Sequence, residues 1–102
     1  MAIHAVMIRI ASGDDYSKRY AETVEAIKKE AEGSMWSEPT STYILKSAKS
    51  ASNLCDSIYF GSPLLESKDT LVVVNLSVTG STGYAQRGVE YPATLKSLMD
   101  AR

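Results

Sequence analysis

The sequence contains little of what most catalytic or metal sites need. It has one cysteine, Cys55, and one histidine, His4. A single cysteine cannot close a disulfide within the chain, and one cysteine with one histidine supply too few ligands for a structural zinc cluster. We interpret His4 as a strand-edge or surface residue rather than a general base, and Cys55 as a packing residue rather than a reactive thiol. A reducing, cytoplasmic setting fits this cysteine usage.

The sequence also lacks a long apolar run and a strong charge. No segment approaches the roughly 20 apolar residues that cross a bilayer, and residues 1–10 lack the basic start of a signal peptide. We therefore expect a soluble protein with no membrane contact. The formal net charge of the 102 residues is −1, so nucleic acid would have to be bound by a local patch.

The most informative stretch is the β-branched and aliphatic run at residues 70–78. Its length and the turn residues around it predict a strand. One alternate set of side chains is wholly apolar, whereas the other turns polar at Asn75 and Ser77. We expect the apolar set to lie against helices, namely Val72, Val74, Leu76 and Val78. The other face would then be partly open to a partner or ligand.

Spacing of apolar residues defines the remaining elements. Residues 3–11 predict a strand, with Arg9 on its more open face. A helix follows the turn at residues 12–15, capped by Asp14 or Asp15, and its apolar stripe recurs at helical spacing. Short strands at 34–38 and 42–46 flank a turn at Pro39-Thr40. The predicted stripes are Tyr16, Tyr20, Val24, Ile27 and Ala31 on the first helix, and Ala51, Leu54, Cys55 and Ile58 on a second helix capped by Ser50 or Ser52.

This order is typical of one α+β domain, residues 1–102, with the ferredoxin-like βαββαβ arrangement. Two helices would cover one face of a four-stranded antiparallel sheet. Residues 79–102 would form a tail that packs on the sheet or on a dimer partner, with a short terminal helix that has Pro92 at its first position. A bare sheet face in so small a domain favours a dimer or a ligand.

Several short motifs resemble those of the small bacterial proteins called SinR-like. This group is similar to the second CRISPR-associated adaptation protein and to VapD-type and GhoS-type toxin–antitoxin components. The motifs are Asp15-Tyr16, Met35-Trp36, Ser41–Lys46, Ser50-Ala51, Asp69–Val74, Gly83-Tyr84, Gly88, Leu95 and Leu98. The resemblance implies a ferredoxin-like fold and a homodimer, and in the nuclease-competent members metal-dependent cleavage of RNA or DNA.

The sequence departs from that family at the catalytic position. The resemblance implies an aspartate near the end of the first strand, and Arg9 stands at that place. A guanidinium cannot ligate Mg²⁺. We therefore expect no catalytic residue, metal or cofactor. The alternative is a metal-dependent endoribonuclease or deoxyribonuclease that binds Mg²⁺ through Asp14 and Asp15.

Basic and aromatic residues suggest a binding function instead. Arg9, Lys46, Lys49 and Arg87 could contact phosphates on the open side, and Trp36, Tyr43 or Tyr84 could stack on bases. The sequence thus predicts a non-catalytic homodimer that binds RNA or DNA, or a protein partner through the open sheet face.

Overall fold

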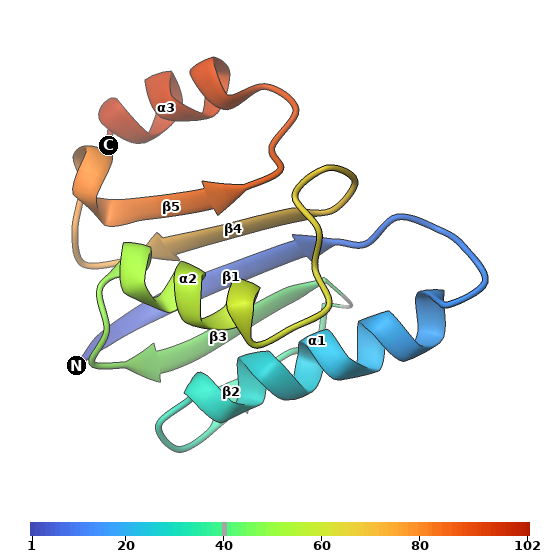
Figure 1. Ribbon diagram of the computed structural model, residues 1–102. Coiled ribbons are helices and arrows are strands. Elements are labelled where there is room, and N and C mark those ends of the chain that lie inside the picture. The colour runs from blue at the N-terminus through green and yellow to red at the C-terminus, as the bar shows by residue number, and fades with distance from the viewer. Residues whose placement is uncertain (40) are drawn as a thin grey trace.

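A five-stranded antiparallel sheet forms the middle of the protein in the computed structural model, which describes residues 1–39 and 41–102. The strands follow the order β2-β3-β1-β4-β5 across the sheet (Figure 1). Their bounds are β1 Ala2–Arg9, β2 Met35–Trp36, β3 Thr42–Ser47, β4 Thr70–Asn75 and β5 Tyr84–Arg87. The α+β class is confirmed, but the expected number of four strands is wrong.

The extra strand is β5, which pairs with β4 along residues that show no clear strand pattern. Val74 lies opposite Tyr84 and Val72 opposite Gln86. A short 3-10 turn, η1 (Gly80–Gly83), reverses the chain between β4 and β5. The residues of β5 do not alternate clearly between apolar and polar, so the sequence did not predict this strand. It forms because it pairs with β4. The tail therefore extends the sheet of its own chain.

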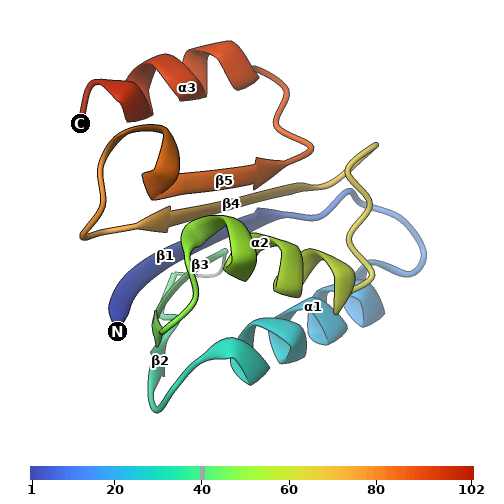
Figure 2. The ribbon, with the colours of Figure 1, turned by 60° about the vertical axis from the view of Figure 1, so that its left-hand side comes forward.

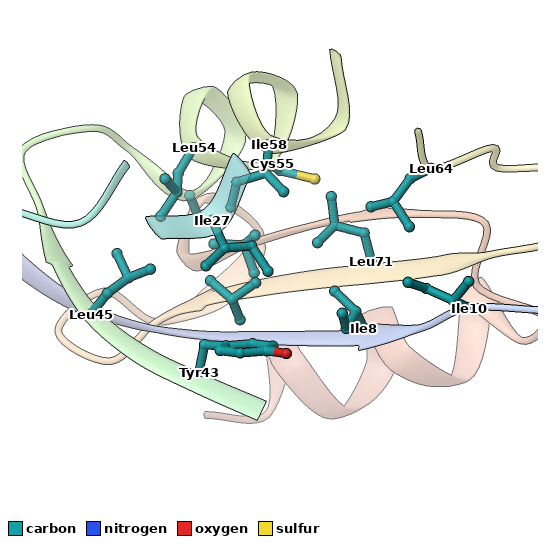
Figure 3. Close-up of a cluster of buried hydrophobic side chains, with 13 residues drawn as sticks. Ile8, Ile10, Ile27, Tyr43, Leu45, Leu54, Cys55, Ile58, Leu64 and Leu71 are labelled. Atoms are coloured by element: carbon teal, nitrogen blue, oxygen red, sulfur yellow. The ribbon is translucent and has the colours of Figure 1, made fainter. Parts of the chain in front are cut away.

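Two helices cover one face of the sheet and complete the hydrophobic core. They are α1 (Tyr16–Glu30) and α2 (Ala51–Phe60). The predicted stripe of α2 is confirmed, since Ala51, Leu54, Cys55 and Ile58 are all buried. The Ser50 hydroxyl accepts a hydrogen bond from the Asn53 amide at 3.1 Å and so caps α2. Figure 3 shows the core side chains between these helices and the strands.

The predicted orientation of β4 is wrong. Leu71 and Val73 belong to the core beneath α1 and α2, so Val72 and Val74 lie on the opposite face. Asn75 misled the prediction: it shares the helix-covered face and is buried, and its side-chain oxygen accepts a hydrogen bond from the Ser77 amide at 2.8 Å. The sequence pattern alone cannot distinguish a polar residue that is buried with a hydrogen-bond partner from one that is exposed to water.

The third helix, α3 (Pro92–Asp100), runs alongside β5 at the edge of the molecule away from α1 (Figures 1 and 2). Pro92 is at its start, as predicted. Figure 3 views the strands nearly edge-on and shows the faint red α3 on the opposite side from α2. No residue of α3 is fully buried, so the helix covers only part of that side.

Two local predictions have a different outcome. The turn at Pro39-Thr40 lies partly outside the described residues, because Thr40 is not among them. Asp15 occupies the cap position of α1, but its side chain makes no capping hydrogen bond.

Over residues 1–39 and 41–102, no helix combines the length and apolar character needed to span a membrane.

Candidate binding face on the sheet

We call the sheet surface opposite α1 and α2 the open face. Strand register places the alternate residues of each strand there, because directly paired residues share a face. They are Ile3, Ala5, Met7, Arg9, Trp36, Thr42, Ile44, Lys46, Thr70, Val72, Val74, Tyr84 and Gln86. Among these described positions Arg9 and Lys46 are the only charged residues, and both are cationic.

Exposure divides the open face into two parts. Trp36 is 47% exposed, Ile3 41% and Met7 37%, whereas Val72 and Val74 are buried. The buried part lies toward β5, on the side where α3 packs. The hydrogen bond to Asp100 raises the pKa of Lys96 on α3, and the nearby Tyr84 phenol adds a smaller electrostatic effect in the same direction. The accessible part of the open face therefore spans β1, β3 and β2.

A hollow of about 450 Å³ lies at the β2 side of this accessible part. It is lined by Ile3, Glu32, Gly33, Ser34, Trp36, Ile44, Leu45 and Lys46. Backbone contacts fix its rim, because the Glu32 amide donates to the Lys46 carbonyl at 2.9 Å. The Glu32 carboxylate also accepts from the Ala48 amide through Oε2 at 2.8 Å. The hollow thus combines an indole wall, aliphatic side chains, one cation and one fixed carboxylate.

The predicted cationic residues do not form one patch. Arg9 pairs with Thr70 and Lys46 with Ile3, so they lie at opposite ends of β1. Ile3 and Arg9 are six residue steps apart along the strand, which corresponds to roughly 20 Å. A single-stranded ligand could contact both, but only by running along the strand.

Arg87 and Lys49 lie elsewhere. Arg87 pairs with Leu71, so it projects toward α2 and not onto the open side as expected. Its guanidinium lies 4.5 Å from the centre of the Tyr59 ring and 3.1 Å from Asp56 Oδ1. The Lys49 ammonium is 2.5 Å from Glu30 Oε1. Both cations already have acidic neighbours, which leaves Arg9 and Lys46 for the open face.

The predicted aromatic platforms also separate. Trp36 is exposed on the open face, whereas Tyr43 belongs to the buried core, where its hydroxyl lies 3.1 Å from that of Tyr20. Tyr84 shares the face but lies on the side where α3 packs. The alternative metal pair, Asp14 and Asp15, is exposed before α1. The described part of the chain contains no group of three or more histidine, cysteine or acidic residues able to hold a metal ion.

The interpretation of Cys55 is confirmed, and that of His4 is wrong. Cys55 is 1% exposed in the core, and burial raises the pKa of its thiol to about 11. His4 is also fully buried, on the central strand. Neither of its ring nitrogens has a hydrogen-bond partner among the described residues. Burial lowers the pKa of His4, and the backbone of Lys49 and Ser47 opposes this only in part.

This burial predicts a pH-dependent stability. The folded protein holds His4 neutral, while the unfolded chain protonates it near its ordinary pKa of 6.5. The free energy of unfolding should therefore be constant above that value and fall as the pH drops below it toward the folded pKa, by at most about 1.4 kcal/mol per pH unit. Urea unfolding across this range measures the slope. His4→Leu should flatten it, and an unchanged slope in that variant would assign the effect to other groups.

Sequence reasoning missed a buried ion pair between Arg19 of α1 and Asp69, which are 6% and 2% exposed. Asp69 also accepts from the Ala11 amide at 2.8 Å and from the Leu65 amide at 2.9 Å. Burial alone would raise the pKa of Asp69, but these hydrogen bonds and Arg19 hold it below its ordinary value. Because the pair is buried and its hydrogen bonds join α1 to two other parts of the chain, we assign it a structural role.

Comparison with known proteins adds no relative to this description. No protein-family model, no curated protein and no solved structure matches the chain.

Proposed function

We propose that this protein is a non-catalytic binding protein that holds single-stranded nucleic acid on its open face. One observation carries the proposal: an exposed tryptophan and exposed aliphatic side chains share a sheet face whose strands carry only positive charge. Bases stack on exposed aromatic side chains, and lysine or arginine nearby contacts the phosphates. The strand positions of this face carry no acidic residue, and Glu32 lies only at its edge, so repulsion toward a polyanion is limited.

The fold supports a finer proposal. Strands β4, β1, β3 and β2 are adjacent in that order, and two helices cover one face. We propose that this part of the sheet is a ferredoxin-like unit to which β5 is added at one edge. We propose on this basis, and on the short motifs named above, a relationship to the SinR-like and CRISPR-adaptation-like proteins. Arg9 then stands on the open face at the end of β1, where it would contact phosphate instead of metal.

Substitutions on the open face should weaken binding of a labelled single-stranded oligonucleotide. Loss of one stacking platform costs about 1–3 kcal/mol, so Trp36→Ala should raise the Kd by about fivefold to a hundredfold. Lys46→Ala should weaken binding, because one phosphate contact is lost. The slope of log K against log salt should then become less steep by about one. Fluorescence anisotropy at several salt concentrations measures both quantities. RNA and DNA strands of one sequence would identify the preferred polymer.

Lys18→Ala is the matched control, because Lys18 is a highly exposed lysine on α1, on the other side of the sheet. It should leave affinity nearly unchanged. The same samples with Mg²⁺ and then EDTA test the alternative function. Cleavage that EDTA abolishes and that Asp14→Asn with Asp15→Asn removes would replace the proposal with a metal-dependent nuclease.

A second candidate occupant is another copy of the chain, favoured by the aliphatic exposure of Ile3 and Met7 beside Trp36. A homodimer formed through the open face would bury these side chains and shield the indole. Sedimentation over a range of protein concentrations distinguishes the two cases. Self-association that Met7→Lys prevents, without any affinity for oligonucleotides, would favour the dimer as the role of this face.

A further inference from the structure

We infer that the hollow beside Trp36 is a site for a guanine base, an inference that rests on the proposed function because it names the base that the bound strand would place there. The volume of about 450 Å³ lies in the range of small-molecule sites. Trp36 gives this hollow an aromatic wall, which the groove between α1 and Gly61 lacks.

The walls suit a flat aromatic ligand. Trp36 is half-exposed and lies opposite Ile44 in the strand register, and Ile3 lies on the neighbouring strand β1. A base could stack on the indole and contact both aliphatic side chains at its edge. Gly33, which also lines the hollow, adds no side chain to it. These features favour a base without choosing among bases.

The Glu32 carboxylate selects guanine among the four bases. A carboxylate only accepts hydrogen bonds, and its two oxygens offer about four lone-pair positions. Glu32 is exposed; its Oε2 accepts from the Ala48 amide, which orients the group, and its Oε1 has no hydrogen-bond partner among the described residues. Guanine presents two adjacent donors, N1–H and the N2 amino group, on one edge. Adenine and cytosine place an acceptor beside their amino group, and uracil flanks its N3–H with two carbonyl oxygens, so each would be repelled in part.

Lys46 completes the arrangement. The Lys46 backbone carbonyl accepts a hydrogen bond from the Glu32 amide. This bond holds the two residues that carry the cation and the carboxylate next to each other. The Lys46 side chain is exposed, and no ion pair involves it in the described part of the chain. Its ammonium is thus available for the phosphate of a nucleotide whose base occupies the hollow. The charge of each group matches a different part of one guanine nucleotide.

The test uses the natural fluorescence of Trp36, the single tryptophan of the chain. A short uridine oligonucleotide with one central guanosine is compared with the same strand carrying central adenosine or cytidine. The guanosine strand should bind about tenfold tighter, as expected for one bidentate base contact. Glu32→Gln should remove most of this preference while retaining affinity for the plain uridine strand. Glu38→Gln, an equal charge change outside the hollow, should keep it.

The results separate this inference from the proposed function. Equal affinity for all strands, or a preference that Glu32→Gln leaves intact, would overturn the guanine site while strand binding stands. Absence of any quenching or anisotropy change would overturn both. Guanosine monophosphate alone, quenching as strongly as the oligonucleotide and more strongly than adenosine monophosphate, would support the base site but show that a free nucleotide rather than a strand is the ligand.

Discussion

Replacing Asp69 with alanine is expected to lower the free energy of unfolding by about 3–5 kcal/mol, which is the usual cost of breaking a buried ion pair by removing one partner. The substitution leaves the buried Arg19 guanidinium without its counter-charge. Arg19 Nη1 already lacks a hydrogen-bond partner among the described residues, so little else compensates the charge. The amides of Ala11 and Leu65 would also lose their acceptor.

The large effect follows from what Asp69 joins. Its carboxylate connects the residues after β1, the loop before β4, and α1 through Arg19. Arg19 Nη2 in turn donates to the Pro63 carbonyl at 3.3 Å. Three segments distant in sequence therefore depend on one side chain. Urea denaturation followed by fluorescence and circular dichroism gives the free energy of unfolding.

Two further variants show whether charge burial is the cause. Asp56→Ala removes a carboxylate from the solvent-screened pair with Arg87 and should destabilise the fold far less than Asp69→Ala does. Arg19→Met combined with Asp69→Leu removes both buried charges and should be less destabilised than Asp69→Ala alone. A double variant as unstable as the sum of its single substitutions would show that the ion pair is not the source of the effect.

Gly88→Ala should be the second most damaging change, at about 2–5 kcal/mol. Gly88 has φ +71°, which costs a residue with a side chain about 1–2 kcal/mol. A Cβ at this position would also overlap the Asp69 carbonyl and lie 2.8 Å from the Glu66 carbonyl, so the backbone would have to move, at about 1–3 kcal/mol by analogy with overpacking. Thermal and urea unfolding measure the loss.

Gly80→Ala separates these two costs. Gly80 has φ +75°, but a Cβ there meets no atom within 4 Å. It should therefore show the backbone cost without the overlap, about 1–2 kcal/mol. If the two variants lost equal free energy of unfolding, the chain near Gly88 would have to relax easily. The close approach of Gly88 to Asp69 would then add nothing to the cost of the substitution.

The sequence was informative where one local signal determined the structure. The apolar stripe of α2, the cap at Ser50 and the position of Pro92 each depend on residues a few positions apart, and all three are confirmed. The predictions failed where a distant segment decided the outcome. Strand β5 forms because β4 is beside it, and Asn75 is buried because its side chain is bonded within a turn. The spacing of apolar residues along the chain reveals neither the pairing of β5 with β4 nor the burial of Asn75.

The site shows the same division. Strand alternation correctly placed Arg9 on the face away from the helices, and Trp36, which was suggested as a stacking residue, is exposed on the same face. It could not show that Arg87 turns toward Asp56, since that depends on the direction of an unrecognised strand. Glu32 was not singled out, because its position beside Trp36 results from the connection between the end of α1 and β3. Arg19 and Asp69 are 50 residues apart and carry no motif.

The position of Cys55 has a kinetic consequence. Its sulfur lies in the core with the side chains of α2 (Figure 3), 1% exposed and with the pKa of the thiol raised to about 11. A thiol reagent attacks the thiolate, so the closed molecule is protected both by exclusion of the reagent and by protonation. Labelling therefore proceeds through molecules that have opened around α2. With reagent in excess, the rate at which the single thiol disappears records how often this helix leaves the sheet.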